Sequence, residues 1–402
     1  MMYAQQYNYK GLLAPLANGG GAAPVVTNRA TGGAVVVPKQ IIIAGGGTGG
    51  HIFPAIAIAN AIKRIDSEIK ILFVGATGKM EMEKVPQAGF DIKGITIAGF
   101  NRNALHKNLS LPLKLLLSFF QVKSIFKAFR PNAVIGVGGY STFPVLKYAQ
   151  SKGIPTYIHE SNSFAGKSNI LLGKNATTVF VATKGMESFF PAKKLMVSGN
   201  PVRAAIANSI LTKKEATSFF GLREDAKTIL VIGGSLGAKS INDAITNILA
   251  DIEANDWQLI WQTGKVHANV YQSHAKGKKN IWIGEFINQM EMAYTAADVV
   301  VSRAGAMAIA ELCAVAKPAI LIPYPYAADD HQTFNAQTLV KHEAAFLIPE
   351  KDLSTKLLKQ LTHFFNDDAL VNRYSQNIHQ LYYKNADTLI AKTIIEQCFT
   401  GK

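Results

Sequence analysis

Residues 41–54 read Ile-Ile-Ile-Ala-Gly-Gly-Gly-Thr-Gly-Gly-His-Ile-Phe-Pro, and this stretch decides the fold. An apolar run of strand length passes directly into five glycines, a histidine and a helical pattern. Glycine has no side chain and adopts positive φ, so such a loop lets the backbone approach a phosphate or a sugar closely. The first N–H groups of the following helix point at the same place, which favours an anion there. The stretch therefore predicts a strand–loop–helix unit that binds a ligand.

A second unit of this kind lies in the other half of the chain. Residues 229–238 read Ile-Leu-Val-Ile-Gly-Gly-Ser-Leu-Gly-Ala. Strand and helix patterns alternate throughout, which is typical of parallel sheets. We expect strands near residues 40–44, 71–75, 133–137, 154–158, 178–182, 228–232, 257–262, 280–283, 298–301 and 318–322, and a short strand at 195–198 before the hinge. The predicted fold class is α/β, with two Rossmann-like domains that contain parallel sheets and face one cleft.

The domain boundaries follow from composition and pattern. Residues 1–38 are rich in Gly, Ala and Asn, lack the features of a signal peptide, and are expected to form a disordered extension. The N-terminal domain is expected over 39–199 and the C-terminal domain over 200–375, with a hinge at Gly199-Asn200-Pro201-Val202-Arg203. Residues 376–402 should form a C-terminal helix that closes the structure.

Composition narrows the class of partner. The chain has 402 residues, 48% of them hydrophobic, and 42 Lys and Arg against 27 Asp and Glu, for a net charge of +15. Such an excess suggests a polyanionic partner, although it can also serve solubility alone. No run of 18 apolar residues occurs, so no membrane-spanning helix is expected. Cys313 and Cys398 lack metal-ligand spacing, which indicates a reduced, cytoplasmic setting.

Two nucleotide-binding alternatives fit the glycines poorly. Gly45, Gly47 and Gly50 match G-x-G-x-x-G, but a dinucleotide fold also needs an acidic residue after the second strand, and residues 73–79 contain none. Residues 233–240 resemble a P-loop, yet Ala238 replaces the glycine before the lysine. A diphosphate cradle made of backbone amides and the Ser235 hydroxyl needs neither feature.

Polar residues in the first half gather where strands are expected to end. His51 begins a helix, and a helix N-terminus lowers the pKa of an imidazole and keeps it neutral, as a general base requires. The residues His159-Glu160-Ser161-Asn162 and Gly138-Gly139-Tyr140 each follow an expected strand, so they should open onto the same sheet edge. Capping and turn formation are the simpler interpretations of these residues.

The second half shows a comparable pattern. Glu311 lies on an otherwise apolar helix, where a carboxylate is costly unless it is exposed or has a partner such as a pair of sugar hydroxyls. The polar residues 329–335 precede another helix, and their amides suit sugar hydroxyls. No Asp-x-Asp triplet occurs, which favours neutralisation of a diphosphate by helix N-termini and Arg303 rather than by a metal.

Residues 109–130 predict an amphipathic helix, with Ser110 as its cap and Pro112 in its first turn. One face, assigned to the core, contains Leu115, Phe119, Val122, Phe126 and Phe129. The other begins apolar and ends basic, and contains Leu113, Leu116, Leu117, Phe120, Lys123 and Lys127. Such a face suits an anionic membrane surface, whereas burial of both faces is the alternative.

Together these motifs resemble the MurG family of glycosyltransferases over residues 39–400. The marks of the resemblance are G-G-G-T-G-G-H-I-F-P at 45–54, G-G-Y at 138–140, H-E-S-N at 159–162, G-N-P-V-R at 199–203, G-G-S-L-G-A at 233–238, E-F-I at 285–287, S-R-A-G-A at 302–306, A-E-L at 310–312 and H-Q-T-F-N-A at 331–336. The resemblance implies the two-domain GT-B architecture, with the acceptor and the membrane on the first domain and the nucleotide sugar on the second. It also implies inversion at the anomeric centre, with no metal and no other cofactor.

The resemblance implies a role for each matching residue. On the acceptor side it implies His51 as the base, Glu160 as a second catalytic residue, Tyr140 and Asn162. On the donor side it implies the Ile287 backbone at the uracil, Glu311 at the ribose, Ser235 and Arg303 at the diphosphate, and Gln332 and Asn335 at the sugar. Further donor contacts are implied for Thr48, Gly49, Gly50, Asn162, Arg203, Gly237 and His331. The family often has Gln where Leu236, Ser161 and His331 stand here.

The resemblance, together with the expected helix over 109–130, thus implies a peripheral enzyme on the cytoplasmic face of the inner membrane, with no nucleic-acid partner. It would transfer N-acetylglucosamine from UDP-N-acetylglucosamine to the C4 hydroxyl of undecaprenyl-pyrophosphoryl-N-acetylmuramoyl-pentapeptide, a step of peptidoglycan synthesis on which cell shape and division depend. The rival within the fold is a transferase for another lipid or small-molecule acceptor. A nicotinamide oxidoreductase and a non-catalytic nucleotide-sugar binding protein are the rivals from other classes.

Overall fold

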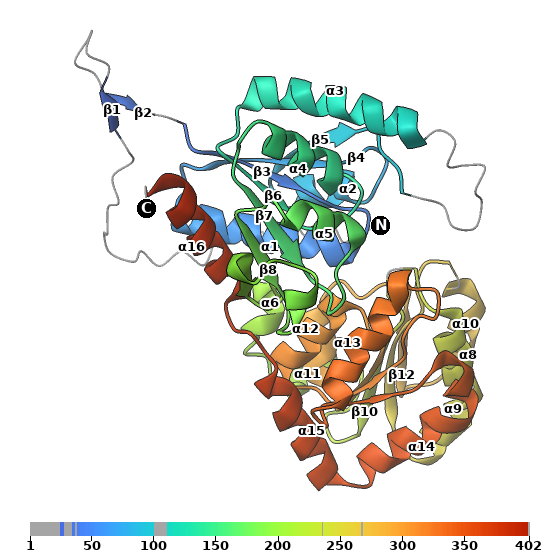
Figure 1. The fold of residues 1–402 in the computed structure, drawn as a ribbon. Coiled ribbons are helices and arrows are strands. Elements are labelled where there is room, and N and C mark those ends of the chain that lie inside the picture. Colours follow the sequence, from blue (N-terminus) through green and yellow to red (C-terminus); the bar gives the residue numbers. More distant parts are fainter. Residues whose placement is uncertain are drawn as a thin grey trace.

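The computed structural model describes residues 38–99, 111–234, 236–266 and 268–400, with only the backbone of Ala328. It also gives the backbone of two short antiparallel strands, β1 (Val25–Thr27) and β2 (Ala34–Val36). The expected extension over 1–38 therefore lies mostly outside the described residues. The described chain folds into two α/β domains, one above the other in Figure 1.

The N-terminal domain has a parallel sheet in the order β5-β4-β3-β6-β7-β8-β9. Its strands are β3 (Gln40–Ala44), β4 (Lys70–Ala76), β5 (Asp91–Ile95), β6 (Ala133–Gly136), β7 (Thr156–Glu160), β8 (Thr178–Val181) and β9 (Leu195–Val197). Its helices are α1 (Gly49–Ile65), α2 (Glu81–Gln87), α3 (Leu111–Phe129), α4 (Thr142–Ser151) and α5 (Lys167–Gly173). Apolar residues of α3, α4 and α5 pack on one face of the sheet, and those of α1 pack on the other.

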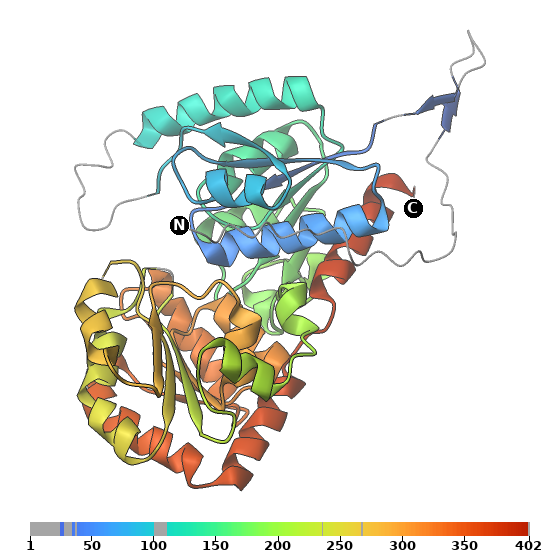
Figure 2. The same cartoon turned by 180° about the vertical axis from the view of Figure 1, so that it is seen from behind.

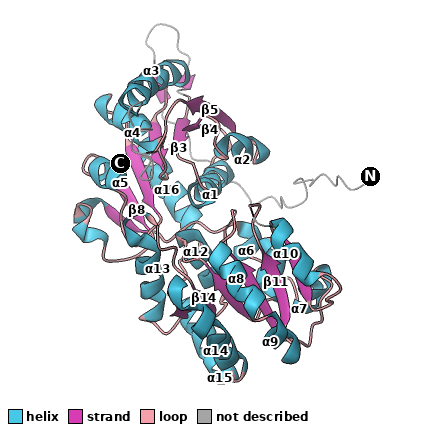
Figure 3. Cartoon of the chain, turned by 90° about the vertical axis from the view of Figure 1, so that its right-hand side faces the viewer, coloured by secondary structure: helices cyan, strands magenta, loops and turns pink. Residues whose placement is uncertain are grey.

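The C-terminal domain has a parallel sheet in the order β12-β11-β10-β13-β14-β15. Its strands are β10 (Thr228–Ile232), β11 (Gln258–Gln262), β12 (Ile281–Gly284), β13 (Val299–Ser302), β14 (Ala319–Leu321) and β15 (Ala345–Leu347). Its helices are α6 (Ala204–Ala207), α7 (Lys213–Phe219), α8 (Lys239–Asn247), α9 (Leu249–Ala254), α10 (Ala268–Ala275), α11 (Met290–Ala296), α12 (Ala306–Val315), α13 (His331–Val340), α14 (Leu353–Phe365) and α15 (Asp368–Gln380). Helices cover both faces of each sheet (Figure 3).

The last helix returns to the first domain. Helix α16 (Ala386–Phe399) packs against α1, where Ile390 and Ile394 are fully buried, and Arg64 pairs with Asp387 at 3.0 Å. Figure 2 shows α16 in red beside α1 in blue. The chain therefore passes between the domains at 199–203 and again after α15, and α15 runs through the boundary expected at residue 375.

The expected strands are present, with two instructive differences. Strand β7 continues to Glu160, so His159 and Glu160 lie inside the strand, opposite Phe180 and Val181 of β8, rather than after it. The edge strands β5 and β15 were not expected, because both are short and partly exposed and so lack a strong apolar pattern.

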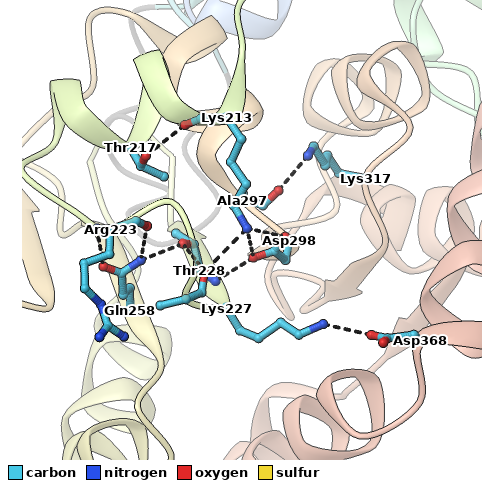
Figure 4. A network of polar contacts seen from close by, with 11 residues as sticks. Lys213, Thr217, Arg223, Lys227, Thr228, Gln258, Ala297, Asp298, Lys317 and Asp368 are labelled. Atoms are coloured by element: carbon cyan, nitrogen blue, oxygen red, sulfur yellow. Dashed lines mark hydrogen bonds and ion pairs between the residues drawn. The ribbon is translucent and has the colours of Figure 1, made fainter.

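Polar contacts close the amino end of the second sheet (Figure 4). Asp298 accepts hydrogen bonds from Lys213 Nζ at 2.9 Å and from the Thr228 backbone N–H at 2.7 Å. Gln258 pairs with the backbone of Arg223 through both of its amide atoms, at 2.7 and 2.8 Å. The polar groups at this end are therefore occupied by the protein itself.

Candidate functional site

The first glycine loop follows β3 at the carboxyl end of its sheet and rests on a buried acid. Glu81 is 1% exposed, and its carboxylate accepts hydrogen bonds from the N–H of Gly47 at 2.8 Å and of Ala76 at 2.9 Å. A Cβ on Gly46 would lie 2.3 Å from the Glu81 carboxyl carbon, so only glycine allows this approach. Sequence reasoning missed Glu81, which lies just beyond the segment after β4 that was searched for an acid.

His51 lies in the first turn of α1, directly after this loop. Its Nδ1 is 3.1 Å from the Gly46 carbonyl oxygen and 3.4 Å from Thr48 Oγ1. A carbonyl oxygen can only accept, so Nδ1 carries the proton and Nε2 has the free lone pair. Among the described residues Nε2 has no hydrogen-bond partner; a Cβ on Gly138 would lie 2.7 Å from it.

Burial lowers the pKa of His51 below its ordinary value, while the Gly46 carbonyl and the charges of Glu160 and Glu81 oppose the shift. The sequence argument assigned the lowering to the helix start, whereas the main cause in the structure is burial of the ring. The consequence expected for the imidazole is the same, because a neutral ring with a free Nε2 can accept a proton.

Glu160 organises a loop. Its carboxylate is 3% exposed and accepts four hydrogen bonds, from the backbone N–H and the side-chain amide of Asn162, the N–H of Gly166 and the amide of Asn169, at 2.9–3.2 Å. Both oxygens are therefore committed to the chain between residues 160 and 169. All four contacts position this loop, and none of them leads to His51.

The second glycine loop follows β10 and is held by an amide. Gln262, which is 2% exposed, donates from Nε2 to the Gly234 carbonyl at 3.1 Å and accepts at Oε1 from the Ile287 N–H at 3.1 Å. It thus joins the loop to the segment expected at the uracil, and it occupies the N–H of Ile287. A Cβ on Gly237 would lie 2.0 Å from the Thr263 carbonyl oxygen. Ser235, expected at the diphosphate, lies outside the described residues.

Glu311 has protein partners at the domain boundary. Its side chain pairs with Arg203, at 2.9 Å from Nη2 and 3.2 Å from Nε, and accepts from the Tyr294 hydroxyl at 3.0 Å. The exposed-face interpretation of this carboxylate is wrong, since Glu311 is 8% exposed. Arg203 in turn lies over the ring of Phe53 in α1, 5.1 Å from its centroid. Arg203 therefore connects the expected ribose ligand to the helix that carries His51.

Arg303 is also engaged by the protein. Its guanidinium pairs with Glu350 at 2.5 Å, donates to Ser240 Oγ at 3.1 Å and lies over the ring of Tyr324. Its side chain is 12% exposed. These contacts hold the end of β13 to neighbouring loops, so a diphosphate contact from Arg303 requires the side chain to share or exchange these partners.

Residues expected on opposite sides of the site meet across the domains. Asn335 of α13 accepts at Oδ1 from the Ser163 N–H at 2.9 Å, and its Nδ2 donates to Asn162 Oδ1 at 3.4 Å. Phe164 stacks on Phe334, with ring centroids 5.5 Å apart. The expected sugar ligand Asn335 is thus 3% exposed and bound to the first domain.

The remaining expected residues are more open. Gln332 Oε1 accepts from the Tyr324 N–H at 2.9 Å, and its neighbour His331 lies close enough to lower the pKa of His51. Tyr140 is 50% exposed beside Gly99. Thr48 is the N-cap of α1, which begins with Gly49 and Gly50. No group of three or more metal-ligating side chains occurs in the part of the chain that the structure describes.

Known proteins match this chain over most of its length. The glycosyltransferase family 28 N-terminal domain matches residues 41–181, and the family 28 C-terminal domain matches residues 228–397. A Bacteroides thetaiotaomicron protein named UDP-N-acetylglucosamine--N-acetylmuramyl-(pentapeptide) pyrophosphoryl-undecaprenol N-acetylglucosamine transferase is 47% identical over 353 residues, 87% of this chain and 95% of that protein. The chain belongs to the MurG family.

Further relatives agree with this family. A Flavobacterium psychrophilum protein with the same name is 45% identical over 349 residues, 87% of this chain and 95% of that protein. The crystal structure of Acinetobacter baumannii MurG superposes with a TM-score of 0.72 at 29% identity, and covers 89% of this chain and 100% of that one. The calicheamicin glycosyltransferase CalG4 has a TM-score of 0.66 at 12% identity, which shows the shared GT-B fold alone.

Proposed function

We propose that this chain is an inverting glycosyltransferase of peptidoglycan synthesis. It transfers N-acetylglucosamine from UDP-N-acetylglucosamine to the C4 hydroxyl of undecaprenyl-pyrophosphoryl-N-acetylmuramoyl-pentapeptide. The names of relatives that are 45–47% identical over 87% of the chain support this substrate pair. The acceptor binds the N-terminal domain and the nucleotide sugar binds the C-terminal domain.

The observation that carries the mechanism is the contact of His51 Nδ1 with the Gly46 carbonyl, from which the tautomer of the ring follows. With Nδ1–H donated to Gly46, Nε2 takes the proton of the acceptor hydroxyl while its oxygen attacks the anomeric carbon. The bond from that carbon to UDP breaks, and the departing diphosphate carries the negative charge. The second glycine loop and its helix start stabilise that charge, with no metal and no other cofactor in the step.

Donor binding requires rearrangement at the domain boundary. For Glu311 to bind the ribose hydroxyls, it must share its carboxylate between them and Arg203. Asn335 can likewise contact the sugar by sharing or exchanging its contacts with Ser163 and Asn162. The donor would therefore replace contacts that join the domains, which links its binding to their relative position.

Helix α3 supports the finer proposal that the enzyme rests on the cytoplasmic face of the inner membrane. It lies at the edge of the N-terminal domain away from the C-terminal domain (Figure 1). Val122 and Phe126 are buried, whereas Leu113, Leu116, Leu117 and Phe120 are 44–62% exposed and Lys123 and Lys127 are exposed. Apolar residues followed by lysines on one face suit an anionic lipid surface. In the described residues, no helix is long and apolar enough to cross a bilayer.

The test of the reaction uses the full chain with labelled UDP-N-acetylglucosamine and the lipid-linked muramoyl pentapeptide. Label should enter the lipid extract. Transfer only to a different lipid or small-molecule acceptor would support the rival within the fold. Donor hydrolysis without transfer, or UDP-sugar binding without turnover, would overturn the proposal.

The test of the membrane surface compares two triple variants. Changing Leu116, Leu117 and Phe120 to Ser should abolish sedimentation with anionic vesicles while turnover of a short-chain, soluble acceptor continues. The matched control changes Ile65, Leu171 and Leu389, which are exposed elsewhere on the described surface, to Ser and should still sediment. Unchanged binding by the folded α3 variant would contradict the proposal, and salt-insensitive binding would contradict the role of the lysines.

A further inference from the structure

One peptide group lies between Glu81 and His51. The N–H of Gly47 donates to Glu81 Oε2 at 2.8 Å. The carbonyl of Gly46 accepts from His51 Nδ1 at 3.1 Å. This N–H and this carbonyl belong to the same planar peptide unit, the one that joins Gly46 to Gly47. The side chains are therefore linked by two hydrogen bonds through a single amide.

We propose that Glu81 is a positioning residue that acts on His51 through the Gly46–Gly47 peptide, as a carboxylate–peptide–imidazole relay. The relay fixes the Nδ1–H tautomer, orients the ring and strengthens Nε2 as a base. The inference rests on the proposed role of His51 as the general base. It adds a residue to the machinery that neither the sequence motifs nor the proposed reaction includes.

The direction of the hydrogen bonds supports the relay. A carboxylate only accepts, an imidazole Nδ1–H donates to the carbonyl, and the amide between them is polarised in the same sense by both neighbours. Bonds arranged in this way strengthen one another where water is excluded. Glu81 is 1% exposed and the peptide has no room for a side chain on Gly46, so the arrangement is rigid.

Glu81 also acts on the His51 imidazole through its negative charge, in addition to the hydrogen bonds of the relay. Glu81 raises the pKa of His51 against the effect of burial, as does Glu160, whereas His331 lowers it. The neighbouring His159 is fully buried, and burial lowers its pKa to about 4, so it is neutral near pH 7. Glu160 holds its own loop through four hydrogen bonds and has no hydrogen bond to the Gly46–Gly47 peptide.

The alternative is that Glu81 only anchors the loop, because it also accepts from the Ala76 N–H at 2.9 Å. The two roles predict different behaviour of the base. An anchor affects how much active enzyme forms and how well it binds, whereas a relay also sets the pH at which His51 gains its proton.

The experiment compares Glu81→Gln with Glu83→Gln, a control on the same helix whose side chain is 68% exposed. Removing a carboxylate that orients a metal-bound histidine costs about 10- to 100-fold. We expect a fall in kcat of that order for Glu81→Gln, with the KM for UDP-N-acetylglucosamine unchanged. Since the charge that raised the pKa of His51 is lost, the acid limb of the kcat/KM profile should move to lower pH. Glu83→Gln should change neither quantity.

A double variant separates this inference from the proposed function. In a His51→Ala background, Glu81→Gln should have no further effect on kcat. If His51→Ala alone has wild-type kcat, the base role itself fails. If His51→Ala lowers kcat but Glu81→Gln leaves kcat and the acid limb unchanged, only the relay is overturned. The relay is also overturned if Glu81→Gln slows both backgrounds equally.

A measurement on the unaltered enzyme covers the case in which Glu81→Gln does not fold. ¹⁵N NMR of histidine-labelled protein, with His51 assigned by its loss in His51→Ala, should show a protonated Nδ1 and an unprotonated Nε2 at pH 7.5. A proton on Nε2 with an unprotonated Nδ1 at that pH would overturn the relay, because Nδ1 could not then donate to the Gly46 carbonyl.

Discussion

Each of the two glycine loops follows a buried strand of a parallel sheet, but different side chains hold them in place. The first is held by the carboxylate of Glu81, which accepts two backbone N–H bonds. The second is held by the amide of Gln262, which donates to one backbone group and accepts from another. Both anchors are buried at the carboxyl end of a parallel sheet, so the difference is one of charge.

This difference separates binding of an anion from removal of a proton. A carboxylate beneath the second loop would repel a diphosphate, and the neutral amide leaves the positive field of the helix start intact. A carboxylate beneath the first loop stabilises the protonated form of a nearby imidazole and so favours its uptake of a proton. The anchors therefore match a donor on the C-terminal domain and a base on the N-terminal domain.

The largest effect should come from removing the base. His51→Ala should lower kcat by about 10² to 10⁴, the usual range for general acid–base catalysis. Donor binding should barely change, since the proposed function places the nucleotide sugar on the other domain. His342→Ala, which changes an exposed histidine of the C-terminal domain, is the control. Near-wild-type turnover by His51→Ala at saturating acceptor would contradict the base role.

The pH profile of the wild-type enzyme tests the same residue. The base works only when neutral, so kcat/KM should fall as the pH drops through the pKa of His51. Because burial holds that pKa below 6.5, the midpoint of the fall should lie on the acid side of 6.5. A fall whose midpoint lies above pH 7 and that is absent from a slow His51→Ala variant would contradict the direction of the shift.

The second-largest effect concerns the ribose. Glu311→Ala should weaken UDP binding by about 1–3 kcal/mol, the scale of hydrogen bonds to a charged group. A 2′,3′-dideoxy-UDP should bind the wild type and the variant alike, as calorimetry can measure. Tyr294→Phe is the control, because it removes a partner of Glu311 and keeps the carboxylate. If Glu311→Ala still prefers UDP over the dideoxy form by the wild-type margin, Glu311 does not bind the ribose.

Much of the fold could be predicted because its strands are buried on both faces. Strands β3 and β10 read as nearly continuous apolar runs, and each leads into glycines that mark a close approach of backbone. The edge strand β5 alternates between exposed and partly buried residues. The return of α16 to α1 was not foreseen, since an amphipathic helix does not specify which apolar surface it covers.

The residues of the site likewise fall into those that the sequence could predict and those that it could not. His51 and its glycines are contiguous, so local sequence suggests their chemistry. Glu81 is 34 residues from Gly47, and Arg203 is 108 residues from Glu311; nothing local marks either pair. Sequence alone also predicted what a ligand would contact but not the protein partners that already occupy Glu311, Arg303 and Asn335. Only the folded contacts show that such ligands must share or exchange these partners.

A smaller effect should follow from making the second loop resemble the first. Gln262→Glu places a carboxylate beneath the donor loop, and this carboxylate cannot donate to the Gly234 carbonyl as the amide does. The Kd for UDP should therefore rise about tenfold, or ~1.4 kcal/mol. Gln258→Glu, at the opposite end of β11, adds the same charge to a residue that is also 2% exposed. It should lower stability and leave the Kd unchanged. Equal Kd values for the wild type and Gln262→Glu would contradict the electrostatic comparison of the loops.

The smallest effect on activity should come from the amino end of the second sheet, where Asp298→Asn weakens the network of Figure 4. The Asn oxygen can still accept from the Thr228 N–H, and the pair with Lys213 is about one-quarter to one-third exposed, at 26% and 32%. We therefore expect a loss of only about 1 kcal/mol in the free energy of unfolding, measured in urea. The KM for the donor and kcat should remain those of the wild type, because the glycine loop that follows β10 lies at the other end of the sheet. A tenfold change in KM would mean that the two ends are mechanically coupled, and Gln258→Glu would then no longer serve as a control for Gln262→Glu.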